Sequence, residues 1–112
     1  MQRRPITALM TSTALLGAVV SATAATAAQP EGMTLMMASC MQCHQVKGIE
    51  NAGNIGPVLS DMKARFPDRS ELAAIIFDET KRNPATVMPP FGRNLILTKQ
   101  QIDTIIDFLY TR

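Results

Sequence analysis

The chain has 112 residues, which is enough for one domain and too short for two. Apolar residues make up 46% of it, but only four phenylalanines and one tyrosine are aromatic, and there is no tryptophan. The formal net charge is +2. A core this poor in large side chains is marginal, so we expect a cross-link or cofactor to stabilise the fold.

The first 28 residues have the pattern of a secretory signal peptide. Two arginines at positions 3 and 4 precede an apolar stretch from Ile6 to Val20, and small residues follow from Ser21 to Ala28. Basic, apolar and small segments in this order are typical of export signals. The apolar stretch falls short of the about 20 residues that cross a bilayer as a helix. We therefore expect cleavage near Ala28, a mature domain of residues 29–112, periplasmic localisation and no membrane anchor in the mature form.

Removal of the signal would leave an electrically neutral domain. Residues 29–112 contain nine basic and nine acidic side chains. This balance argues against nucleic acid or an anionic membrane surface as a partner.

The two cysteines indicate which cofactor the domain uses. They lie in the run Cys40-Met41-Gln42-Cys43-His44, and His44 is the single histidine. A disulfide closing so short a loop restrains the unfolded chain little, a thioredoxin-like pair needs flanking strands, and zinc needs four ligands. Cys-x-x-Cys-His is instead the attachment motif of haem c. On a helix, residues i, i+3 and i+4 share a face, so both sulfurs can bond haem vinyl groups while His44 faces the iron.

The hydrophobic spacing predicts an all-α domain with about three main helices. The first helix is expected to carry the attachment motif at its C-terminal end and to bury its methionines in the core. The reason is that apolar and motif residues follow helical spacing: Met33, Met36, Met37, Cys40, Met41 and His44. Residues 45–57 are rich in glycine and asparagine and are predicted to be a loop.

The second and third helices are predicted from their capping residues. The second begins after Asp68 as N-cap, with Glu71 as the reciprocal residue of a capping box, and is expected to bury Leu72, Ile75 and Ile76. Residues 83–92 form a proline-rich loop. The third opens at Thr98 with Gln101 as its capping partner and is expected to bury Ile102, Ile105, Ile106 and Leu109.

Methionine is the leading candidate for the second axial ligand of the iron, since no other histidine exists. The methionines of the first helix would lie on the side of the haem that His44 occupies. Met62 follows His44 closely, whereas Met88 lies in a loop stiffened by Pro89 and Pro90. The sequence therefore predicts Met88 as the ligand, with Met62 as the alternative.

These motifs together resemble the class I cytochromes c over the whole of residues 29–112. The resemblance implies that the Pro57 carbonyl accepts a hydrogen bond from the axial histidine. Within that family the chain is most similar to the SoxX subunits, the small mono-haem components of SoxAX sulfur-oxidation cytochromes. That similarity rests on residues 53–57, residues 82–92, Ile96-Leu97-Thr98 and the following Gln101-Ile102.

The resemblance to SoxX implies an electron-transfer subunit with one covalently attached haem c. Its partners would be a SoxA-type cytochrome subunit, a SoxYZ-type carrier protein and a downstream electron acceptor. The SoxAX heterodimer acts as an L-cysteine S-thiosulfotransferase, joining thiosulfate to a carrier cysteine while two electrons leave through haem. This chain would supply no catalytic residue, since its cysteines are consumed by the haem.

Two other interpretations stay open. The first is a generic soluble shuttle to a terminal oxidase or other redox partner, which would use the same haem chemistry. Six cations could form its docking face or lie dispersed in solvent: Lys63, Arg65, Arg69, Lys81, Arg82 and Arg93. A haem-free periplasmic thiol or metal protein is the second alternative, and the colour of the purified protein would identify it.

Overall fold

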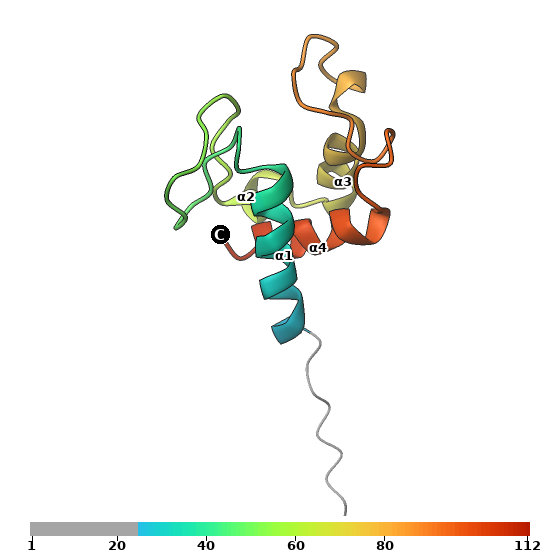
Figure 1. The fold of residues 1–112 in the computed structure, drawn as a ribbon. Coiled ribbons are helices and arrows are strands. Elements are labelled where there is room, and N and C mark those ends of the chain that lie inside the picture. The colour runs from blue at the N-terminus through green and yellow to red at the C-terminus, as the bar shows by residue number, and fades with distance from the viewer. Residues whose placement is uncertain (1–24) are drawn as a thin grey trace, which may run out of the picture.

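The computed structural model describes residues 25–112, which form four α-helices and one 3₁₀-helix (Figure 1). Their order is α1 (Ala25–Ser39), α2 (Met62–Arg65), α3 (Arg69–Asp78), η1 (Glu79–Lys81) and α4 (Lys99–Leu109). Within these residues there is no strand, only isolated bridges from Val46 to Ile49 and to Leu59. The all-α prediction is confirmed. Most of the predicted signal peptide, residues 1–24, lies outside the described residues, so export stays a prediction.

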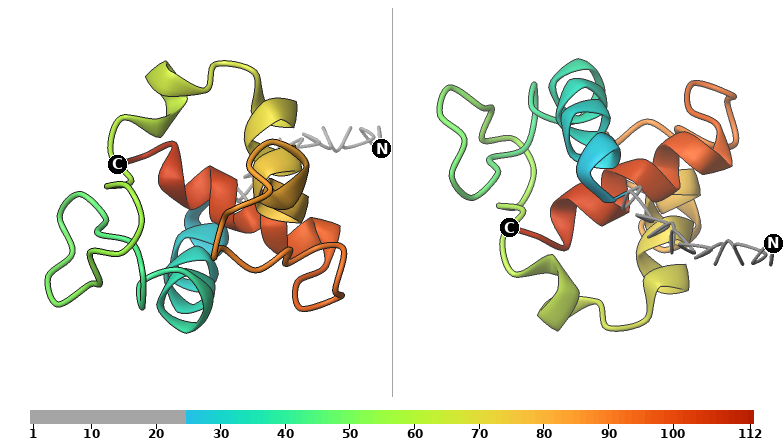
Figure 2. Two further views of the ribbon diagram at one scale, coloured as in Figure 1. Left: turned by 90° about the horizontal axis from the view of Figure 1, so that it is seen from above. Right: turned by 90° about the horizontal axis from the view of Figure 1, so that it is seen from below.

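The main helix contact is the crossing of α1 over α4, which lie side by side in both views of Figure 2. Gly32 allows this close approach, because a Cβ atom at that position would lie 2.6 Å from the Phe108 Cβ. The core side of α4 is buried as predicted, with the addition of Phe108: Ile102, Ile105, Ile106, Phe108 and Leu109. Burial of these side chains removes the most apolar stripe of the chain from water.

Helix α3 begins after Asp68 as predicted, but its cap differs in detail. The Asp68 carboxylate accepts hydrogen bonds from the Ser70 N–H at 2.8 Å and the Ser70 hydroxyl at 2.7 Å, and the expected reciprocal bond of Glu71 is not formed. Ser70 instead caps the carboxylate with both its N–H and its hydroxyl. Ile75 is half-buried rather than fully buried as expected, because it flanks the buried stripe of Leu72 and Ile76.

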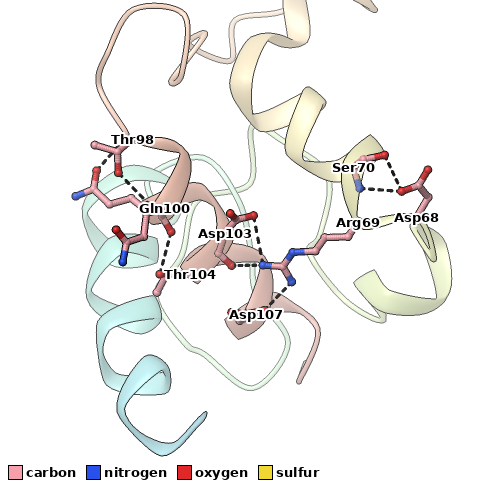
Figure 3. A network of polar contacts seen from close by, with 9 residues as sticks. Asp68, Arg69, Ser70, Thr98, Gln100, Asp103, Thr104 and Asp107 are labelled. Carbon is pink, nitrogen blue, oxygen red and sulfur yellow. Dashed lines mark hydrogen bonds and ion pairs between the residues drawn. The ribbon is translucent and has the colours of Figure 1, made fainter. Parts of the chain in front are cut away.

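The start of α3 is tied to α4 by Arg69 (Figure 3). Its guanidinium donates to the Asp107 carboxylate at 2.6 Å and to the Asp103 carbonyl at 2.7 Å. The N-terminus of α4 has the predicted capping box, in which Thr98 and Gln101 exchange backbone and side-chain hydrogen bonds at 2.9 and 3.1 Å. The Arg69 bonds fix the orientation of the two helices relative to each other, and the capping box fixes where α4 begins.

Two features of the first half differ from the predictions. Helix α2 was not predicted, because four residues are too few to show helical periodicity. The methionines of α1 do not all pack in the core: Met36 is fully buried, but Met37 is 58% exposed because the helix turns that side to solvent. Among the described residues, no helix is both long and apolar enough to cross a membrane.

Candidate functional site

The attachment motif lies in a turn that directly follows α1. The sequence predicted it inside the helix, but α1 ends at Ser39. Helical bonding nevertheless continues for one more turn: the Cys40 N–H donates to the Met36 carbonyl at 2.9 Å, and the His44 N–H donates to the Cys40 carbonyl at 3.0 Å. The Cys43 N–H also donates to the Cys40 carbonyl, at 3.1 Å and over three residues instead of four. Cys40 and His44 therefore keep the helical one-turn spacing on which the predicted chemistry depends.

Both cysteines are free and half-buried. Burial, with a smaller contribution from the neighbouring Cys43, raises the pKa of the Cys40 thiol to about 11. A thiol with so high a pKa is protonated at neutral pH and is a poor nucleophile by itself. The Cys40 thiol is therefore not activated as a nucleophile by its surroundings, and the two cysteines are not joined in a disulfide.

His44 is oriented by the loop that folds back over it. Its Nδ1 atom lies 2.7 Å from the Pro57 carbonyl oxygen, the contact that the family resemblance implied. Since a carbonyl can only accept a hydrogen bond, Nδ1 carries the proton and Nε2 presents its lone pair. A histidine in this tautomer, held through its other nitrogen, is prepared to bind a metal through Nε2.

Two glycines allow the loop to approach the motif closely. A Cβ atom at Gly56 would lie 2.4 Å from Cε1 of the His44 ring, and one at Gly53 would lie 2.0 Å from the Gln42 carbonyl oxygen. Their N–H groups donate to the Cys43 and Met41 carbonyls at 2.8 and 2.7 Å. The sequence indicated these glycines as loop formers and as part of the segment that resembles SoxX, and neither observation predicted that they pack against the motif. Their closeness to the motif is a long-range contact that local composition does not reveal.

Met88 and Met62 have different environments. Met62 is 2% exposed within the core, and its sulfur accepts a contact of 3.4 Å from the Arg65 guanidinium. Met88 is half-buried at the edge of the core, and its N–H donates to the Thr86 hydroxyl at 3.1 Å. Met62 is therefore a core residue. Met88 sits in a proline-rich loop, as expected.

The loops that carry His44 and Met88 rise on the same side of the α1–α4 pair and stand apart from each other (Figure 1). The structure brings Cys40, Cys43 and His44 together in one turn, with Pro57 beside them. It places Met88 on the other loop. No group of three or more histidine, cysteine or acidic side chains able to hold a metal ion occurs in the described part of the chain.

A family model for cytochrome c matches residues 30–112, nearly the whole of the described chain. The chain belongs to the cytochrome c family. No curated protein matches it. Membership in this family establishes the expected fold, an electron-transfer role and covalent haem c as the cofactor.

The side chains at the attachment turn fit haem c. Two free, half-buried thiols stand three residues apart in the turn, and a histidine with a proton-bearing Nδ1 leaves Nε2 for the iron. The close packing of Gly56 on the His44 ring fixes the plane of the imidazole. Imidazole nitrogen is a common ligand of haem iron, whereas the two thiols suit bonding to the haem vinyl groups rather than to the metal.

Proposed function

We propose that this chain is an exported mono-haem cytochrome c that transfers electrons in the periplasm. Cys40 and Cys43 would form the two thioether bonds, His44 would be one axial ligand and Met88 the other. The observation that carries the proposal is the hydrogen bond from His44 Nδ1 to the Pro57 carbonyl, because it selects the tautomer that ligates iron.

Each residue has a definite part in this function. Cys40 and Cys43 would hold the haem through thioether bonds to its two vinyl groups, an addition that requires no oxidant. His44 would bind the metal through Nε2 while the Pro57 carbonyl restrains its Nδ1. Met88 supplies a neutral thioether that favours ferrous over ferric iron and so raises the potential. When bound, the haem supplies reversible one-electron chemistry.

The more specific proposal is a SoxX-type subunit that collects electrons when a SoxA-type partner joins thiosulfate to a carrier-protein cysteine. Its support is the similarity of residues 53–57 and 82–92 to that subunit family. The arrangement of cations also favours it over a shuttle with a basic docking face. Four of the six candidate cations are engaged within the chain: Arg65 on Val58, Arg69 on α4, Arg82 on Glu79 and Arg93 on Asp78.

The subunit assignment is tested by activity in the presence and absence of its partner. The haem-loaded protein alone should accept and donate electrons without thiosulfate-dependent turnover. Addition of a SoxA-type subunit and a SoxYZ-type carrier should produce that turnover. Thiosulfate oxidation by this chain alone, or no effect of the partners with active carrier present, would contradict the SoxX assignment while leaving the cytochrome function intact.

The axial assignment is tested by substituting the two candidate methionines separately. We expect Met88→Ala to abolish the weak far-red sulfur-to-iron band of the oxidised protein and to lower the reduction potential, because water or an external ligand replaces the thioether. Met62→Leu is the matched control. It should keep the band and cost less than about 1.5 kcal/mol of stability, as volume-conserving core substitutions do. The opposite pattern would move the ligand to Met62.

A further inference from the structure

Three consecutive residues where α3 meets η1 hold both ends of the segment that carries Met88: Phe77, Asp78 and Glu79. We call residues 82–93 the Met88 loop. At its start, the Arg82 N–H donates to the Glu79 carbonyl at 3.0 Å, and the Arg82 guanidinium contacts the Glu79 carboxylate at 3.0 and 3.2 Å. At its end, the Arg93 N–H donates to the Phe77 carbonyl at 3.2 Å. The Arg93 guanidinium forms an ion pair of 3.0 Å with the Asp78 carboxylate.

The carboxylates of these two pairs are buried. The Asp78 side chain is 0% exposed and the Glu79 side chain 10%, whereas the Arg93 and Arg82 side chains are about half-exposed at 52% and 58%. A buried carboxylate is costly unless it is paired and hydrogen-bonded. The two loop arginines therefore form the ion pairs that compensate these carboxylates, with further positive charge from Lys81 near Asp78, and the loop is bound to α3 and η1 by more than van der Waals contact.

Asp78 is fixed in place by a second set of contacts. Its other carboxylate oxygen accepts hydrogen bonds from the hydroxyl and the N–H of Thr80. The Thr80 hydroxyl, with a smaller contribution from the positive charge of Arg93, lowers the pKa of Asp78, so the carboxylate is ionised at neutral pH. Since α3 and η1 hold Asp78, Arg93 is drawn to a fixed point of negative charge.

The Met88 loop is stiff between its two ends. Pro84, Pro89 and Pro90 restrict its backbone, and the Thr86 hydroxyl accepts the Met88 N–H at 3.1 Å. Gly92 lies so close to the Phe77 ring that a Cβ atom would be 1.9 Å from Cδ2. A stiff segment transmits a displacement of its ends to its middle. The position of the Met88 sulfur therefore depends on how the ends are anchored.

We propose that Asp78 and Arg93 are positioning residues for the axial methionine: their ion pair closes the Met88 loop onto the end of α3 and keeps the Met88 sulfur on the haem iron. This proposal rests on the proposed role of Met88 as ligand. Arg93 is the more informative of the two arginines, because its pair with Asp78 closes the loop, whereas Arg82 and Glu79 are only three residues apart.

The test measures imidazole binding to the oxidised, haem-loaded protein, because imidazole competes with Met88 for the iron. Arg93→Gln, Asp78→Asn and the double variant should bind imidazole about tenfold more tightly, because loss of the ion pair with a buried carboxylate weakens the closure of the loop. The far-red band should weaken in parallel. The double variant should resemble the single ones, because both residues act through one contact.

The matched controls are Arg69→Gln and Asp107→Asn, which break an ion pair between α3 and α4 outside the Met88 loop. They should lower the free energy of unfolding yet leave imidazole affinity within about twofold of the parent, as expected for distant independent sites. If Asp78→Asn fails to fold, Arg93→Gln decides the question, because it leaves the Asp78–Thr80 contacts in place.

Unchanged imidazole affinity in folded Arg93→Gln would overturn the positioning role, and so would an equal rise in the control variants. Met88→Ala separates this outcome from failure of the ligand assignment. If Met88→Ala loses the far-red band while Arg93→Gln behaves like the parent, only the positioning role is wrong. If Met88→Ala keeps the band, the ligand assignment itself fails.

Discussion

The α1–α4 crossing and the loop over the attachment turn are held together by different forces. At the crossing, apolar side chains of α4 such as Ile105, Ile106 and Phe108 are almost completely buried, and Gly32 lets the two helices approach. In the loop of residues 45–60, only Val46 is buried among the large apolar side chains, whereas Ile55 and Val58 are 69% and 48% exposed. The loop is organised instead by backbone hydrogen bonds to the turn of residues 40–44.

This difference indicates which part of the domain depends on the cofactor. Apolar burial stabilises a helix pair in proportion to the area removed from water. Backbone hydrogen bonds in an exposed loop contribute little net stability, because water competes for the same groups. We therefore expect changes at the haem site to affect the loop directly, and to affect the helix pair only where the haem itself is lost.

The largest expected effect comes from removing both attachment thiols. Cys40→Ala with Cys43→Ala should abolish the haem that stays bound during denaturing gel electrophoresis. A small domain has only about 5 kcal/mol of stability to lose, so we expect a largely unfolded chain by circular dichroism. Met37→Ala, an exposed change on α1, is the control and should retain haem and fold. A stable, folded and colourless double variant would show that the helical pair suffices alone.

A smaller effect is expected from adding one methyl group in each region. Gly32→Ala should lower stability by about 1 kcal/mol, because overpacking costs about 1–3 kcal/mol and helix propensity returns about 1 kcal/mol. Its haem spectrum and potential should stay unchanged. Gly56→Ala should displace the His44 ring, from which the new Cβ would be 2.4 Å, and so change the spectrum and potential more than the unfolding free energy.

Gly48→Ala is the control for backbone strain in the same loop. Gly48 has a φ of 79°, and no atom lies within 4 Å of the position that a Cβ would take, so alanine strains the backbone without touching His44. It should cost about 1–2 kcal/mol and leave the haem spectrum unaltered. Equal spectral changes in both loop variants would mean that loop strain, rather than contact with the ring, orients the histidine.

The smallest expected effect is on how the free energy of unfolding declines at acid pH. Hydrogen bonds from the Ser70 hydroxyl and, to a smaller extent, from the Ser70 N–H lower the pKa of Asp68. The contribution of this cap to stability is therefore complete above the ordinary aspartate pKa, and it is lost as the pH falls through the lowered pKa. Asp68→Asn keeps a good N-cap but does not titrate. Unfolding by denaturant at stepped pH should therefore show similar stability at pH 7 and a flatter decline below about pH 4. An unchanged decline would exclude Asp68 as a contributor.

Local features were predictable from the sequence because their partners are near in the chain. The Thr98–Gln101 capping box, the Asp68 cap, the glycine-rich and proline-rich loops and the Cys-x-x-Cys-His motif each depend on residues a few positions apart. The contact of His44 with Pro57 came from the family resemblance alone, since the two are 13 residues apart. The end of α1 before Cys40 was missed, because the motif keeps helical spacing in a turn.

The sequence by itself determined the haem-attachment chemistry and the helical class of this cytochrome c. Tertiary structure decided which glycines pack against which side chains, that Met62 belongs to the core, and that Asp78 meets Arg93 at the end of the Met88 loop. The physical reason is range. Capping and ligand spacing are set by backbone geometry over one or two helical turns, whereas close packing and buried ion pairs depend on where distant segments meet once the whole core has formed.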